Sequence, residues 1–144
     1  DAFRDESGSL LLSRTAVPEI GERLWRDYQD FCSRDLGEYD VSYLFVDGIA
    51  ERTRPGQRRE PIMAAWGITS QGNKVLLGLM AGSKEDHEAV CAFFQDMRNR
   101  NLGEPHLVVS DGAAGIIKAI EICFPRSERQ RCSCIDHEKK ELVW

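Results

Sequence analysis

The sequence predicts an α/β protein, built on a mixed sheet with flanking helices, and three observations lead to this fold class. Short apolar and β-branched runs of strand length recur along the chain. Between some of them lie longer segments whose apolar residues are spaced three and four apart, which is typical of amphipathic helices. Two of the strand-like runs, at residues 42–49 and 107–112, carry the same pair of residues, Asp47-Gly48 and Asp111-Gly112.

Length and charge limit the class of protein. A chain of 144 residues fits one domain with a core of its own. The formal net charge of −5 argues against nucleic-acid binding by the whole surface, so any basic binding surface must be local. No run is apolar and long enough for a membrane span. Cys32, Cys91 and Cys123 fall at helix-like apolar positions, which favours reduced thiols and a cytoplasmic protein.

The first predicted element is an amphipathic helix within a lead-in of residues 1–40. The helix is expected to begin near Thr15, and Gly37 and Asp40 mark its exit. Charged side chains form one face. The opposite, apolar face consists of Ile20, Leu24, Tyr28, Phe31 and Cys32.

A meander of three strands is expected to follow this helix. The strands are predicted at residues 42–49, 62–68 and 75–80, which are apolar runs of strand length. A turn at Pro55-Gly56 connects the first two strands, and a turn at residues 70–73 connects the last two. Connections this short favour antiparallel pairing between consecutive strands.

Two helices and two strands complete the predicted order, β-β-β-α-β-α-β. The first helix is expected to begin at Ser83, because an acid follows three residues later as in a capping box. The second helix is expected to stop at Pro125. Strands are predicted at residues 107–110 and around residues 131–134. The apolar stripes are Val90, Phe93, Phe94 and Met97 on the first helix, and Ile116, Ile117, Ile120, Cys123 and Phe124 on the second.

The connection through the first of these helices sets the direction of the fourth strand. Strand–helix–strand connections return to the same sheet with a right-handed crossover, so the fourth strand is expected to lie parallel to the first. Such an arrangement over residues 41–134 is a ribonuclease H-like layout.

Asp47 and Asp111 would then emerge at the same edge of neighbouring strands. Two close carboxylates repel each other, and both stay ionised only when a cation lies between them. Oxygen ligands favour Mg²⁺ or Mn²⁺, which can activate a water or a 3′-hydroxyl for phosphodiester chemistry. The alternatives are that Asp111 caps the following helix and that Asp47 is a carboxylate in a strand-end turn. The two matching Asp-Gly pairs favour the metal.

Two further groups of residues have possible binding roles. A basic hairpin tip beyond Asp47 could contact DNA phosphates, although such a run is more often a solvated loop. It consists of Arg52, Arg54, Arg58 and Arg59. Cys132, Cys134 and His137 are zinc-ligand types at short spacing, but a structural zinc site needs four ligands.

The motifs together resemble the Mutator-type family of insertion-sequence transposases, over residues 12–132. The motifs are Leu12-Ser13-Arg14-Thr15, Tyr43-Leu44-Phe45-Val46-Asp47-Gly48, Arg54-Pro55-Gly56-Gln57-Arg58-Arg59-Glu60, Ala65-Trp66-Gly67, Gly82-Ser83-Lys84-Glu85-Asp86, Val108-Val109-Ser110-Asp111-Gly112 and Arg129-Gln130-Arg131-Cys132. The resemblance implies a ribonuclease H-like domain with an Asp-Asp-Glu triad, in which Asp47 and Asp111 are the two aspartates. It also implies Mg²⁺ or Mn²⁺, DNA partners at the transposon ends and target, and a homo-oligomer of the full-length enzyme.

The chain departs from the family pattern after Cys132. The tail of residues 135–144 does not match, and the family's catalytic Glu comes much later than Glu138 or Glu141. We therefore expect a transposase catalytic-core fragment that is inactive alone because the third acid is missing. One alternative is a non-catalytic DNA-binding or subunit-contact remnant of such an enzyme. Another is an unrelated two-carboxylate hydrolase such as a glycosidase, which the distance between the two aspartates would distinguish.

Overall fold

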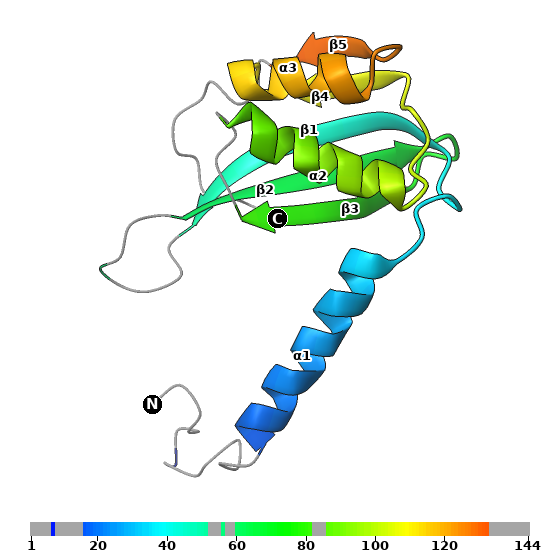
Figure 1. Ribbon diagram of the computed structural model, residues 1–144. Coiled ribbons are helices and arrows are strands. Elements are labelled where there is room, and N and C mark those ends of the chain that lie inside the picture. Colours follow the sequence, from blue (N-terminus) through cyan, green and yellow to red (C-terminus); the bar gives the residue numbers. More distant parts are fainter. Residues whose placement is uncertain (1–6, 8–15, 52–55, 57–59, 82–85, 133–144) are drawn as a thin grey trace. The chain divides into compact units, whose positions relative to one another are not determined.

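The computed structural model describes residues 7, 16–51, 56, 60–81 and 86–132. The chain divides into two units, residues 1–34 and residues 35–144. Helix α1 (Ala16–Ser33) belongs to the first unit, and the second unit contains a sheet with two helices (Figure 1). In the described part of the chain, no helix is long and apolar enough to cross a membrane.

The second unit is built on a five-stranded mixed sheet. Its strands are β1 (Val41–Glu51), β2 (Glu60–Thr69), β3 (Lys74–Ala81), β4 (Leu107–Ser110) and β5 (Glu128–Arg131). They lie in the order β3-β2-β1-β4-β5. β2 is antiparallel to β1 and β3, whereas β4 is parallel to β1 and to β5. The predicted α/β class and the parallel placement of the fourth strand beside the first are confirmed.

Strand β1 lies at the centre of the sheet and separates its two faces. Leu44 and Val46 are buried, whereas Tyr43 and Phe45 are exposed on the opposite face. This alternation is the one expected of a strand that packs on a core with one face only. β1 continues to Glu51, so Asp47 lies inside the strand, opposite Ala64 of β2. The expectation that Asp47 ends the strand was wrong, because pairing with β2 extends β1 further.

Helices α2 (His87–Asn99) and α3 (Ala114–Cys123) lie together on one face of the sheet (Figure 1). The predicted stripe of α2 is buried, and the rings of Phe94 and Phe124 lie 5.3 Å apart between their centroids. The helix cap differs from the prediction, because Asp86 caps α2. Its side chain accepts hydrogen bonds from the N–H groups of Glu88 and Ala89. The expected cap, Ser83, lies outside the described residues.

Strand β5 begins three residues earlier than the sequence suggested. Its four residues, Glu128–Arg131, are all exposed and polar, so no apolar alternation marked them as a strand. Backbone pairing alone defines this edge strand, from the N–H of Glu128, which donates to the carbonyl of His106, to the N–H of Cys132, which donates to Ser110.

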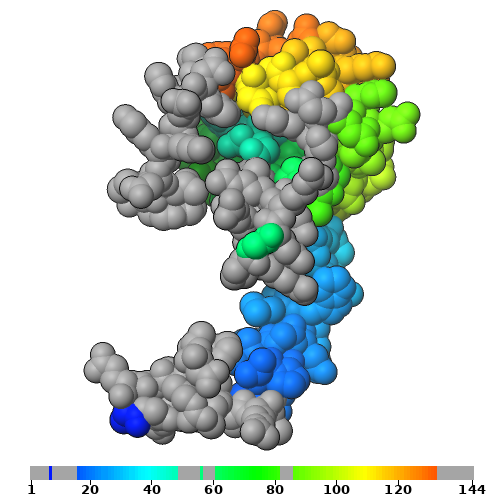
Figure 2. All heavy atoms as spheres, turned by 90° about the vertical axis from the view of Figure 1, so that its left-hand side faces the viewer, coloured from blue at the N-terminus to red at the C-terminus, as the bar shows by residue number. Residues whose placement is uncertain are grey.

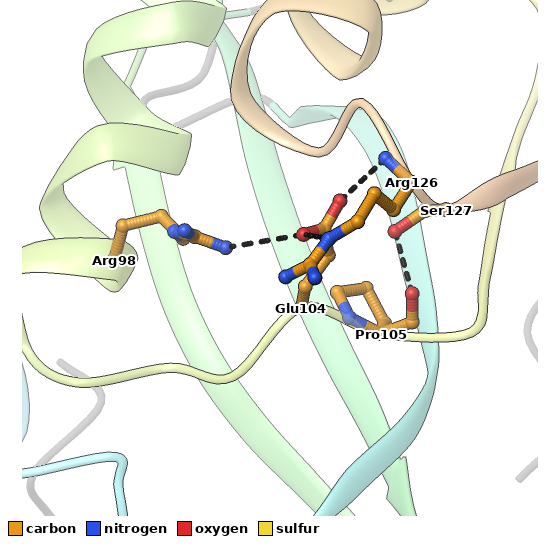
Figure 3. Close-up of polar contacts among 5 residues, drawn as sticks. All are labelled: Arg98, Glu104, Pro105, Arg126 and Ser127. Carbon is orange, nitrogen blue, oxygen red and sulfur yellow. Dashed lines mark hydrogen bonds and ion pairs between the residues drawn. The ribbon is translucent and has the colours of Figure 1, made fainter.

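Polar contacts around the carboxylate of Glu104 connect the turn before β5 to the segment before β4 (Figure 3). Glu104 accepts hydrogen bonds from the backbone N–H of Arg126 at 2.6 Å and from its Nε at 2.9 Å. Arg98 of α2 approaches the same carboxylate at 4.0 Å. The hydroxyl of Ser127 donates to the carbonyl of Pro105. These contacts fix where β5 enters the sheet beside β4.

Candidate functional site

The register of β1 and β4 brings Asp47 and Asp111 to neighbouring positions. The parallel pairing runs from Tyr43 opposite Leu107 to Val46 opposite Ser110. Asp47 and Asp111 each follow directly after this last pair. Figure 2 shows this end of the sheet, where turquoise atoms of β1 adjoin the yellow atoms of the β4 region. Asp47 therefore lies within β1, and Asp111 directly follows the end of the adjacent strand β4.

Asp111 is held by a turn of its own. Its Oδ1 accepts a hydrogen bond from the N–H of Ala113 at 3.0 Å, which is an Asx turn. Helix α3 is capped at Ala113, and no side chain bonds at that cap. The alternative reading of Asp111 as the N-cap of α3 was therefore wrong, because the helix begins later than a cap at Asp111 would require.

Gly112 makes the turn after Asp111 possible. Its φ is +84°, in the left-handed region that side chains with a Cβ rarely adopt. A Cβ at this position would also lie 3.1 Å from Cδ of Arg131 on β5. The Asp111-Gly112 pair thus lets the chain turn sharply from β4 towards α3 against the neighbouring strand.

A cavity of about 490 Å³ adjoins Asp47 on the face of the sheet opposite α2 and α3. Its lining is largely apolar, and Asp47 and Lys74 are its charged members. Lys74 places its Nζ 4.3 Å from the centroid of the Trp66 ring. The lining residues are Phe45, Val46, Asp47, Ala64, Trp66, Ile68, Lys74, Val109, Ser110 and Cys132.

Two neighbouring carboxylates can hold a hard divalent cation, but they do not make a complete ligand set. Mg²⁺ demands near-octahedral oxygen coordination and usually takes one or two carboxylates, with waters or phosphate oxygens filling the other positions. Across residues 16–51, 60–81 and 86–132, no three His, Cys, Asp or Glu residues gather closely enough to hold a metal ion. Within the described residues, the backbone register therefore places two aspartates at neighbouring positions, and their binding of a metal ion stays a prediction.

Most of the other predicted site residues lie outside the residues that the structure describes. Arg52, Arg54, Arg58 and Arg59 lie outside the described residues, so their predicted contact with DNA phosphates remains a prediction. Of the three residues considered as zinc ligands, Cys134 and His137 also lie outside the described residues. The same is true of Glu138 and Glu141. Cys132 is described, and it lines the cavity beside Asp47.

Sequence reasoning missed Trp66, Lys74 and Cys132 as neighbours of Asp47. The period-two alternation of β2 could have placed Trp66 on the face of Ala64. The approach of Lys74 depends on the register of β3, which shifts at Ala65–Trp66. Cys132 required the boundaries of β5, which its polar sequence did not reveal. These neighbours follow from strand register, which a single sequence specifies poorly.

Comparisons with known proteins identify relatives over most of the chain. The model of the Mutator transposase family matches residues 3–140. The transposase for insertion sequence element IS6120 of Mycolicibacterium smegmatis is 34% identical over 121 residues, covering 84% of this chain and 38% of the relative. The transposase for IS1081 of Mycobacterium tuberculosis is 30% identical over 127 residues, covering 87% and 31%.

A third relative, the transposase for IS256 in transposon Tn4001 of Staphylococcus aureus, is 30% identical over 123 residues, covering 84% of this chain and 32% of the relative. The chain therefore spans about a third of the length of the relatives that it matches. The region matched by the family model includes both Asp47 and Asp111. The chain belongs to the Mutator family of transposases.

Proposed function

We propose that this chain is part of the catalytic core of an insertion-sequence transposase, in which Asp47 and Asp111 together hold Mg²⁺ or Mn²⁺. The observation that carries the proposal is the parallel register of β1 and β4, which brings the two aspartates to adjacent positions. Family membership supports the reaction class, since the matched relatives are named as transposases for insertion sequences.

The strand order supports a ribonuclease H-like core. The order β3-β2-β1-β4-β5, with three antiparallel strands followed by two parallel ones, is the arrangement expected of that layout. A fold by itself does not determine a reaction, so the argument for function rests on the aspartates.

The donor set fits a hard cation. Both ligands are carboxylates, and Asp111 is preoriented by the N–H of Ala113, which donates to its Oδ1. A bound Mg²⁺ or Mn²⁺ would supply charge stabilisation for attack on a phosphodiester. The role of Asp47 and Asp111 is to hold the ion at the edge of β1 and β4, where a DNA phosphate can complete its coordination.

We further propose that the 144-residue chain by itself does not cleave or join DNA. Two carboxylates give less negative charge and fewer ligands than a site with a third acid, so the metal is held weakly. The DNA partners are the transposon end and the target.

Calorimetric titration of Mn²⁺ into the purified chain tests the metal site. The native chain is expected to bind Mn²⁺ weakly, and Asp47→Asn and Asp111→Asn should each reduce the affinity at least about tenfold, as losses of metal-supporting groups do. Asp40→Asn, which makes the same change at an exposed position just before β1, is the matched control and should bind like the native chain. Equal Mn²⁺ binding by the native chain and Asp47→Asn would remove Asp47 from the site.

A nicking assay on end-containing DNA in Mg²⁺ tests the activity. The native chain is expected to leave the DNA intact. Nicking that is abolished by Asp111→Asn would instead show that the chain is a working nuclease. Metal-independent DNA binding without any Mn²⁺ affinity would favour the non-catalytic DNA-binding reading.

A further inference from the structure

Two cysteines meet where helices α2 and α3 pack against each other. Cys91 belongs to α2 and Cys123 is the last residue of α3, and the two helices are in direct contact (Figure 1). The thiol of Cys123 donates a hydrogen bond to the backbone carbonyl of Cys91, with 3.8 Å between the sulfur and the oxygen. Both residues belong to the second unit, so this contact does not involve the first unit.

The two thiols differ in their access to solvent. Cys123 is 8% exposed and belongs to the hydrophobic core, whereas Cys91 is half-buried and packs against that core. Burial, followed by the neighbouring Cys91 thiol, raises the pKa of Cys123 to about 11. Cys123 is therefore protonated at neutral pH and reacts poorly with a dissolved oxidant. Cys91 is the thiol of the pair that an oxidant from solvent reaches first.

The second thiol gives this site a chemistry that a single buried cysteine lacks. A buried cysteine by itself usually acts as a small apolar side chain. Two cysteines can form a disulfide when their Cα atoms lie within about 7 Å and their side chains face each other. Because the sulfur of Cys123 already lies against the backbone of Cys91, the bond requires rotation of side chains and no separation of α2 from α3.

The other described cysteines lie in different surroundings. Cys32 belongs to the first unit, where its thiol is beside the hydroxyl of Tyr28. Cys132 lines the cavity that adjoins Asp47, on the face of the sheet away from α2 and α3. Cys32, Cys91, Cys123 and Cys132 are all free thiols in the structure. Cys32 and Cys132 are therefore reference thiols within the same chain.

We propose that Cys91 and Cys123 are a redox-active pair, which hydrogen peroxide converts into a reversible disulfide between α2 and α3. The thiolate of Cys91 attacks one peroxide oxygen and the O–O bond breaks, which leaves a sulfenic acid on Cys91 and releases one water. The sulfur of Cys123 then attacks the sulfur of the sulfenic acid. The hydroxide that leaves takes up the Cys123 proton as a second water, so the peroxide accepts the two electrons that the thiols lose.

This inference does not rest on the proposed function. The pair lies between the two helices, whereas the cavity beside Asp47 lies on the opposite face of the sheet. A dithiol such as dithiothreitol reverses the reaction by thiol–disulfide exchange. The disulfide would join two positions that are far apart in the sequence, which is the kind of cross-link that stabilises a fold most.

Peptide mapping of the full chain by mass spectrometry tests the pairing. The folded chain is treated with hydrogen peroxide, and the remaining thiols are alkylated before digestion. The expected product is one pair of peptides linked through Cys91 and Cys123, which dithiothreitol separates. The same treatment in urea should give several pairings, because the unfolded chain brings all its cysteines together. Several pairings from the folded chain, or no link between Cys91 and Cys123, would overturn the proposal.

Trapping of sulfenic acid with dimedone tests the role of each thiol. Cys123→Ala removes the second thiol, so a dimedone adduct should accumulate on Cys91 that the native chain lacks. Cys91→Ala should give no adduct on Cys123, because that thiol is buried and protonated. Cys132→Ser is the control and should behave like the native chain. Equal labelling of Cys91 in the native chain and in Cys123→Ala would show that Cys123 does not consume the sulfenic acid.

Thermal unfolding measures the effect of the link. The oxidised native chain is expected to unfold about 10 °C above the reduced chain, because the cross-link excludes open conformations of the unfolded chain. Cys91→Ser cannot form the link and should unfold at the same temperature with and without peroxide. An equal gain in Cys91→Ser would show that peroxide acts at another site and would contradict the proposed pair.

Discussion

At the scale of single residues, Glu104 shows how one carboxylate positions an edge strand. Its two oxygens accept hydrogen bonds from the backbone and the guanidinium of Arg126, while its side chain is only 10% exposed (Figure 3). The backbone N–H of Arg126, followed by its side chain, lowers the pKa of Glu104 below its usual value of 4.5. A carboxyl whose pKa is lower in the folded protein stabilises the fold while it is ionised.

Glu104→Gln should therefore make stability less dependent on pH. At pH 7 the variant is expected to be less stable by about 1 kcal/mol, because a charge-assisted contact to a largely exposed arginine is lost. The native advantage is present above pH 4.5 and disappears as the pH falls through the lowered pKa of Glu104. Urea unfolding at a series of pH values measures the difference, with Glu38→Gln as an exposed control. A native advantage that persisted in full well below pH 4.5 would contradict this account.

The sequence singled out Asp47 and Asp111 because each precedes a glycine at a strand-like run, and their role as metal ligands stays a prediction. The sequence placed the cap of α2 at Ser83, whereas Asp86 makes the hydrogen bonds. Both residues are good N-caps, and propensity alone does not choose between two of them three positions apart. Trp66 and Lys74 line the cavity because of how β2 and β3 pair in the sheet. A single sequence carries no local signal for that pairing.

At the scale of elements, the packing of α2 on β3 depends on a glycine. A Cβ at Gly78 would lie 2.8 Å from Cε2 of Phe93, which is buried in the core. No real Cβ contact is this short, so a larger residue would push the helix from the strand or turn the ring out of its rotamer.

Gly78→Ala is expected to destabilise the protein by about 1–3 kcal/mol, as overpacking of a core does. Gly103→Ala is the matched control, because nothing lies within 4 Å of a Cβ at that position. Thermal unfolding followed by circular dichroism compares the two. Adding Phe93→Leu to Gly78→Ala should recover part of the loss, since the shorter side chain makes room. Equal stability of Gly78→Ala and Gly103→Ala would show that α2 and β3 are not in the close contact described here.

The elements with strong periodicity were the ones that the sequence predicted well. The stripe of Val90, Phe93, Phe94 and Met97 identified α2, and the alternation of Leu44 and Val46 identified β1. β5 was placed too late, because Glu128–Arg131 is a polar edge strand whose identity comes from pairing with β4. The end of β1 was set too early for the same reason, since β2 extends the pairing to Glu51.

At the scale of the whole molecule, the crossover rule contributed more to predicting the strand arrangement than any local sequence pattern did. The right-handed return through α2 led to the prediction that β4 lies parallel to β1, and the register bears this out. That placement alone brings together two aspartates that are 64 positions apart in the sequence. The chain spans about a third of the length of the transposase relatives that it matches.

Anomalous diffraction from crystals soaked in Mn²⁺ tests the central claim, that Asp47 and Asp111 share one metal ion. The account predicts a single anomalous peak about 2.2 Å from a carboxylate oxygen of each aspartate, at the edge where β4 ends. The peak should vanish from crystals of Asp111→Asn. Mn²⁺ bound elsewhere, with no peak between Asp47 and Asp111 in the native protein, would contradict it.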